Sequence, residues 1–143
     1  MRNAPSPTSV EQLLAAARAR LRRMAPAEAH AAMDDGALLV DIRSDGQRAA
    51  DGEIPGARIV QRNALEWRLD PGCAHRDPEL CRRGARIVLL CDEGYQSSLA
   101  AATLLSFGVD ATDVIGGFRA WRAAGLPVAT PAGLQPERCD ADN

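Results

Sequence analysis

Two patterns of apolar residues alternate along the chain. Residues 38–42, 57–60 and 86–90 are short, mostly apolar runs, and residues 111–115 form a weaker one. Runs of this length are typical of strands that are buried on both faces of a parallel sheet. We therefore predict that these segments are strands.

Segments with helical spacing of apolar residues lie between these runs. The clearest covers residues 97–107, and shorter helices are predicted over 63–69 and 118–124. Because strands and helices alternate, the pattern predicts an α/β fold in which helices cross over between parallel strands.

The chain before the first strand predicts two more helices. Apolar residues recur at helical spacing over residues 9–24 with arginines on the other face, and Ser9 or Thr8 can cap this helix. Pro26 suits the first turn of a shorter helix, which the turn at 34–36 ends.

Composition narrows the class of protein. A chain of 143 residues fits one domain, and 46% hydrophobic with 25% charged residues is typical of a protein that folds in water. The net charge of −2 provides no basic field for a phosphate backbone, so we expect no nucleic-acid partner. The 17 basic residues are all arginines, which we interpret as a bias of the source.

The cysteines and the N-terminus bear on the compartment. The N-terminal segment is interrupted by arginines and forms neither a secretion signal nor a membrane span. The chain has 4 cysteines but is large enough to build a core without disulfides. We expect reduced thiols, a cytoplasmic protein and no contact with a membrane.

The candidate chemistry lies in residues 91–98, Cys-Asp-Glu-Gly-Tyr-Gln-Ser-Ser, between the most hydrophobic strand and the clearest helix. Ligands of open α/β sheets bind at the carboxyl ends of strands. Gly94 lets the backbone curl, so that amide groups and the N-terminus of the helix from Ser97 can point at one centre. Such a centre favours a thiolate at Cys91, the reactive form of a cysteine.

Four motifs in this order resemble the rhodanese family: Leu-Val-Asp-Ile-Arg at 39–43, Ile-Pro-Gly-Ala at 54–57, the Cys loop, and Gly-Gly-Phe-Arg-Ala-Trp at 116–121. The resemblance covers roughly residues 24–128. It implies a parallel sheet of about five strands with helices on both faces. It also implies a sulfurtransferase in which Cys91 takes a sulfane sulfur and passes it to a thiol or cyanide, with no cofactor and no metal.

The resemblance divides the chain into three parts. Residues 1–23 form an N-terminal helical extension, 24–128 the rhodanese-like domain and 129–143 a C-terminal tail that wraps or frays. Neither the sequence nor the resemblance indicates an oligomeric state.

The same resemblance suggests which residues bind the substrate. The loop residues after Cys91 would line the pocket, and they are Asp92, Glu93, Gly94, Tyr95, Gln96 and Ser97. Many family members have an arginine where Gln96 stands, and two carboxylates would repel an anionic donor unless they point outward. Arg62 is a hypothetical clamp for such a donor, or else a surface arginine. Arg43 can approach the pocket or pair with Asp41.

Other functions remain open. A cysteine phosphatase needs an arginine six residues after its cysteine, but this chain has Ser97 there. A non-catalytic rhodanese-fold module that binds a partner or senses redox state is the main alternative. A zinc site at Cys73, His75 and Cys81 would lack a second close pair of ligands, and a Cys-His protease would need one of two histidines distant in sequence.

The aromatic residues allow simpler predictions. Trp67 and Trp121 stand beside apolar residues on predicted helices, so we expect both to pack against the sheet. Tyr95 stands in the loop, and three roles are open for it: it can line the pocket, contact a partner or face solvent.

Overall fold

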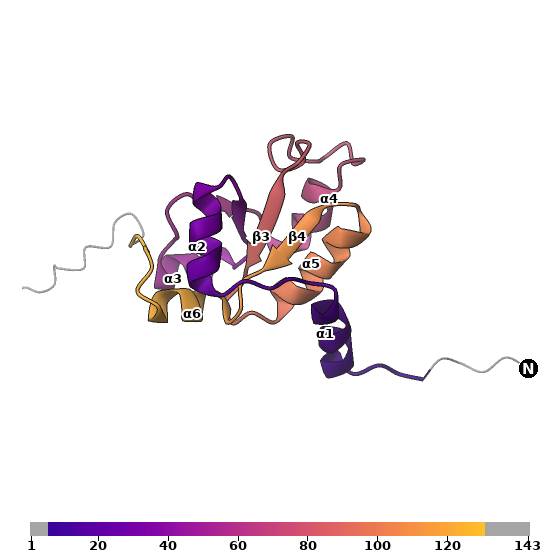
Figure 1. Ribbon diagram of the computed structural model, residues 1–143, viewed down its shortest axis with the longest axis horizontal. Helices are drawn as coiled ribbons and strands as arrows, with labels where there is room; N and C mark the ends of the chain where they lie inside the picture. Colours follow the sequence, from indigo (N-terminus) through magenta and orange to yellow (C-terminus); the bar gives the residue numbers. More distant parts are fainter. Residues whose placement is uncertain (1–5, 131–143) are drawn as a thin grey trace, which may run out of the picture.

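A computed structural model describes residues 6–130 (Figure 1). Its centre is a parallel sheet of four strands in the order β2-β1-β3-β4. The strands are β1 (Leu38–Asp41), β2 (Arg58–Ile59), β3 (Arg86–Leu90) and β4 (Asp110–Asp113). The α/β class and the parallel sheet predicted from the sequence are confirmed.

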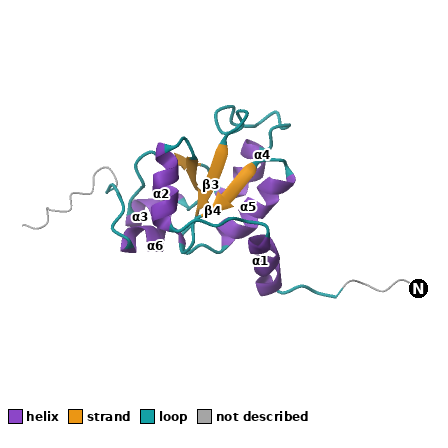
Figure 2. Cartoon of the chain, in the orientation of Figure 1, coloured by secondary structure: helices purple, strands orange, loops and turns teal. Residues whose placement is uncertain are grey.

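Helices cover both faces of the sheet (Figure 2). The helical elements are α1 (Val10–Ala19), α2 (Pro26–Asp34), α3 (Asp45–Asp51), the 3₁₀ turn η1 (Arg62–Ala64), α4 (Leu65–Leu69), α5 (Gln96–Ser106) and α6 (Gly117–Ala123). One face carries α4 and α5, and α1 packs on the outer side of α5. The other face carries α2 and α6.

Strand β3 shows why the apolar runs are continuous. Ile87 and Leu89 belong to the core beneath α4 and α5, whereas Val88 and Leu90 belong to the core beneath α2 and α6. Successive side chains of a strand point to opposite faces, so a strand covered on both faces needs apolar residues at every position.

The edge of the sheet beside β4 explains two differences from the predictions. Helix α1 ends at Ala19 and not at residue 24, because the following residues join the sheet edge. The Met24 amide donates to Asp113 O at 3.0 Å, and the Ile115 amide donates to Met24 O at 2.8 Å. Met24 therefore forms a single parallel bridge to Val114 where a fifth strand would lie.

Helix α3 has no apolar periodicity and was not predicted. Ser44 caps it by accepting from the Gln47 amide, and the Gln47 side chain accepts from the Ser44 amide in return. This capping box satisfies two backbone donors that the first turn leaves without partners. The helix thus begins through its cap and not through a buried face.

The two tryptophans have different environments. Trp121 is fully buried, as predicted, and its indole N–H donates to Pro127 O at 2.9 Å. The prediction for Trp67 is wrong, because 57% of this residue is exposed. Helix α4 buries Leu65 and Leu69, which share one face, and Trp67 lies between them on the opposite face.

The segment after α6 returns toward α3. Ala129 and Glu53 form an antiparallel bridge with amide-to-carbonyl distances of 2.7 and 2.9 Å. Most of the predicted tail 129–143 lies outside the described residues, as does Cys139. Within residues 6–130, every helix is too short or too polar to cross a bilayer.

Candidate functional site at Cys91

Cys91 lies directly after β3, one of the two central strands, and α5 begins five residues later at Gln96. The intervening loop turns back on itself through Gly94, which has a φ of +86°. As a result the Gly94 amide donates to Cys91 Sγ at 3.1 Å. The Cys91 thiol in turn donates to Ser97 Oγ, in the first turn of α5, at 3.2 Å.

Gly94 in the loop and Gly117 at the start of α6 allow this helix to pack closely against the loop. A Cβ on Gly94 would lie 2.7 Å from the Gly116 nitrogen, and a Cβ on Gly117 would lie 2.4 Å from Cys91 O. The close approach lets the Phe118 amide donate to Cys91 O at 2.8 Å. Gly117, the second glycine of the late Gly-Gly motif, therefore lets α6 hold the cysteine loop, and Gly116 caps the helix with a φ of +76°.

The sulfur is sheltered but lies at a surface cleft. Cys91 is 2% exposed and lines a cleft of about 250 Å³ together with Gln47, Asp92, Glu93, Tyr95 and Gln96. The sequence predicted several amides around the sulfur. Within the described residues, one amide and one hydroxyl make hydrogen bonds to it.

Behind the loop lies a buried polar cluster that the sequence analysis did not predict. Asp113, at the end of β4, is fully buried and accepts from Ser97 Oγ at 2.7 Å and from Ser98 Oγ at 2.8 Å. Arg23 Nε donates to the same carboxylate at 2.8 Å. These residues stand far apart in the sequence, and the only local sign was an acid within the weakest of the predicted strands, 111–115.

The mouth of the cleft is acidic. Of the residues that line it, Asp92 and Glu93 are carboxylates and none is an arginine or histidine. Asp92 Oδ2 accepts from Arg119 Nε at 3.2 Å, and this hydrogen bond raises the pKa of Arg119. Glu93 is exposed. Arg119 therefore neutralises the charge of Asp92, and the negative charge of Glu93 remains at the mouth.

Arg62 lies in a neighbouring cleft of about 340 Å³ and not in the cleft of Cys91. The two clefts share Gln47 and Gln96. Arg62 Nη1 donates to both carboxylate oxygens of Glu66, at 2.9 and 3.1 Å. Its charge is thus already paired with Glu66.

Arg43 holds the end of β1. Its guanidinium donates to Asp41 Oδ1 at 3.1 Å, to Asp41 Oδ2 at 2.8 Å and to Gly52 O at 2.8 Å. The guanidinium carbon lies 3.8 Å from the ring centroid of Phe118. The side chain is fully buried. Of the two roles considered from the sequence, the pairing with Asp41 is confirmed.

Two cysteines of the described residues, Cys73 and Cys81, lie in the segment before β3. The His75 amide donates to Cys73 Sγ at 3.4 Å, and Cys81 Sγ donates to Arg68 O at 3.4 Å. Burial raises the pKa of the Cys81 thiol. Across residues 6–130, no three His, Cys, Asp or Glu side chains gather as a metal site would require.

Comparisons with known proteins agree on one family. Residues 25–124 match the Rhodanese-like domain. The chain is 33% identical over 102 residues to the thiosulfate sulfurtransferase GlpE of Stutzerimonas stutzeri, covering 71% of this chain and 84% of that protein. It is 32% identical over 115 residues to the GlpE of Ectopseudomonas mendocina, covering 80% and 95%.

One solved structure matches most of the chain. It is a protein of unknown function from Rhodopseudomonas palustris, described as a possible tyrosine phosphatase. Its TM-score is 0.79 at 29% identity, and the match covers 90% of this chain and 99% of that one.

Proposed function

Because the chain belongs to the rhodanese-like domain family, we propose that it is a sulfurtransferase that carries a sulfur atom as a persulfide on Cys91. The observation that carries the proposal is the contact of the Gly94 amide with Cys91 Sγ, at 3.1 Å, on the carboxyl side of a central strand. A backbone donor aimed at the sulfur stabilises negative charge there in both the thiolate and the persulfide.

The reaction has two steps that balance. The Cys91 thiolate attacks the outer sulfur of a sulfane donor, the bond to that sulfur breaks, and the donor leaves with the electron pair, as sulfite when the donor is thiosulfate. A thiolate or cyanide then attacks the outer sulfur of the persulfide and releases the Cys91 thiolate. No external oxidant or reductant is needed.

The loop residues have different proposed roles. Gly94 and Ser97 contact the sulfur, whereas Asp92, Glu93, Tyr95 and Gln96 line the cleft through which a donor would enter. The carboxylate of Glu93, which forms no ion pair within the described residues, disfavours an anionic donor, so we expect thiosulfate to react more slowly than a donor without net negative charge. Arg62 would act on a donor only after leaving Glu66.

A phosphatase would need a cationic fork over the same cleft. The position six residues after the cysteine holds Ser97, which is fully buried and donates to Asp113. No arginine lines the cleft within the described residues. The observations therefore favour sulfur transfer over phosphate chemistry.

A non-catalytic module that binds a partner or senses redox state is the second candidate. The acidic mouth and the low exposure of Cys91 favour it. For either candidate we propose a cytoplasmic location, in keeping with Cys73, Cys81 and Cys91 forming no disulfide with one another.

The test is the formation of thiocyanate from cyanide and a panel of sulfane donors. We expect turnover by the wild-type protein, none by Cys91→Ser, and unchanged turnover by Cys81→Ser, whose thiol lies outside the cleft. Equal turnover in Cys91→Ser would contradict the proposal. Lack of turnover with every donor and acceptor would favour the binding module.

A further inference from the structure

We propose that Arg18 and Arg23, which lie outside the cysteine loop, are positioning residues that hold the loop in its reactive shape. The inference rests on the proposed sulfur transfer at Cys91. Its basis lies in the two groups that contact the sulfur. Both arginines donate to the carbonyl of Gly94, whose amide contacts the sulfur, and the Ser97 hydroxyl is held by Asp113, the ion-pair partner of Arg23.

The first link is the Gly94 carbonyl. Arg18 Nη2 donates to Gly94 O at 2.6 Å, and Arg23 Nη2 donates to the same oxygen at 3.0 Å. The amide of the same residue donates to Cys91 Sγ. Two cationic donors on the carbonyl therefore set the orientation of the residue whose N–H stabilises charge on the sulfur.

The second link is Asp113. Its Oδ2 accepts from Ser97 Oγ, from Ser98 Oγ and from Arg23 Nη2, the last at 3.2 Å. Because two other donors satisfy this oxygen, the Ser97 hydroxyl can turn its proton to the sulfur when Cys91 ionises. Arg23 in turn neutralises a carboxylate that would otherwise be a buried, unpaired charge close to the thiolate.

Arg18 joins three residues of the loop and of the first turn of α5. Besides Gly94 O, its Nε donates to Ser98 Oγ at 3.0 Å, and its guanidinium carbon lies 5.5 Å from the ring centroid of Tyr95. The loop itself contains no basic residue from position 92 to 98. The positive charge behind the loop therefore comes from a segment more than 70 residues earlier (separations of 71 to 80).

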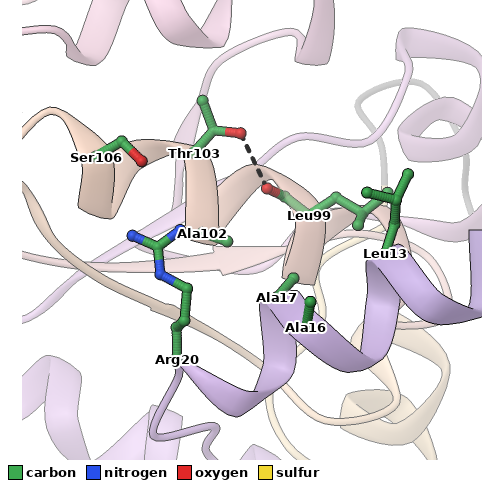
Figure 3. Close-up of a pocket in the computed structure, with 8 residues that line it drawn as sticks. All are labelled: Leu13, Ala16, Ala17, Arg20, Leu99, Ala102, Thr103 and Ser106. Atoms are coloured by element: carbon green, nitrogen blue, oxygen red, sulfur yellow. Dashed lines mark hydrogen bonds between the residues drawn. The ribbon is translucent and has the colours of Figure 1, made fainter. Parts of the chain in front are cut away.

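Helix α1 packs on α5, and this packing places Arg18 beside the cysteine loop. Figure 3 shows Leu13, Ala16 and Ala17 of α1 on the side that faces Leu99 and Ala102 of α5. Ala17 is 6% exposed, so the contact is close at this point. Arg18 is the next residue and reaches the loop at the N-terminal end of α5. This arrangement gives the N-terminal extension a role in the reaction.

The experiment compares Arg18→Ala, Arg18→Lys and Arg22→Ala in the full chain. Arg22 is the matched control, because its side chain is exposed and makes no ion pair or hydrogen bond to the described residues. We measure kcat with the sulfane donor that the wild-type protein turns over fastest. Arg18→Ala should lower this kcat roughly ten-fold, because a charge-assisted contact is lost. KM should change by less than about two-fold, because Arg18 does not line the cleft.

Two further results are expected. Arg18→Lys should recover a large part of kcat, since an ammonium can reach one of the acceptors, and Arg22→Ala should match the wild type. At a fixed neutral pH, iodoacetamide should alkylate Cys91 more slowly in Arg18→Ala. If that variant does not fold, the same comparison is made with Arg18→Lys, which should then be slower than Arg22→Ala.

The outcomes distinguish this inference from the proposed function. Wild-type turnover with unchanged kcat and unchanged alkylation in Arg18→Ala would overturn the positioning role and leave the sulfur transfer standing. A rise in KM without a fall in kcat would also overturn it, since it would place Arg18 on the donor. Absence of any Cys91-dependent turnover in the wild type would refute the proposed function itself.

Discussion

Replacement of Gly94 by alanine tests how the loop is held. Gly94 has a φ of +86°, and a Cβ there would meet the Gly116 nitrogen at 2.7 Å and its Cα at 3.2 Å. The left-handed conformation costs an L-residue about 1–2 kcal/mol. The contact is with backbone that cannot rotate away, and overpacking of this kind costs about 1–3 kcal/mol more.

The matched control is Gly108→Ala at the end of α5. Gly108 has a φ of +82°, but a Cβ there would meet nothing within 4 Å, so only the conformational cost applies. The free energy of unfolding should fall by about 2–5 kcal/mol in Gly94→Ala and by about 1–2 kcal/mol in Gly108→Ala. For a protein of this size, 1 kcal/mol lowers the Tm by roughly 3 °C. The Tm should therefore fall by about 6–15 °C in Gly94→Ala and by about 3–6 °C in Gly108→Ala.

Activity separates the two variants further. Gly94→Ala should also lose turnover, because a shift of the loop takes the amide away from Cys91 Sγ. Gly108→Ala should keep it below its Tm. Equal losses of stability in the two variants would show that the backbones of α6 and the loop are not in close contact at Gly94.

Three other results are expected. Glu93→Gln should lower KM for thiosulfate about two- to five-fold at low ionic strength and less at high salt, because one repulsive charge is removed; a KM that does not move would show that Glu93 faces away from the donor. Trp121→Ala should cost about 3–5 kcal/mol and Trp67→Ala less than about 1 kcal/mol in urea unfolding, since only the first is buried; similar costs would contradict the packing. Burial raises the pKa of Cys81, so less of this thiol is ionised in the folded protein. At a pH near the ordinary pKa of a cysteine, iodoacetamide should therefore alkylate Cys81 more slowly in the folded protein than in the urea-unfolded chain, as measured by peptide mapping. Equal rates would argue against its burial.

The local pattern was sufficient to predict the α/β class, the parallel strands and the turn at Gly94, although the sheet has four strands where about five were expected and one amide contacts the sulfur where several were expected. Strands 38–42 and 86–90 are continuous apolar runs because both faces are covered, and Gly94 marks the turn that aims an amide at Cys91. These features depend on residues that are near one another in the sequence. Such features can be predicted from a single sequence.

The contacts behind the loop could not be predicted in the same way. Arg18 and Arg23 are surrounded by other arginines, and nothing in residues 18–23 distinguishes the two that reach Gly94. Their selection depends on where α1 ends and on the bridge of Met24 to the sheet edge. Trp67 was mispredicted for a related reason, because a helix of five residues buries a single face.

The most direct test of sulfur transfer is the intact mass of the protein after incubation with thiosulfate, inorganic polysulfide and cysteine persulfide in turn. If Cys91 carries the sulfur, the wild type gains one sulfur atom with at least one donor, cyanide removes it, and Cys91→Ser gains none. The same gain in Cys91→Ser, or no gain in the wild type with any donor, would show that Cys91 does not carry sulfur.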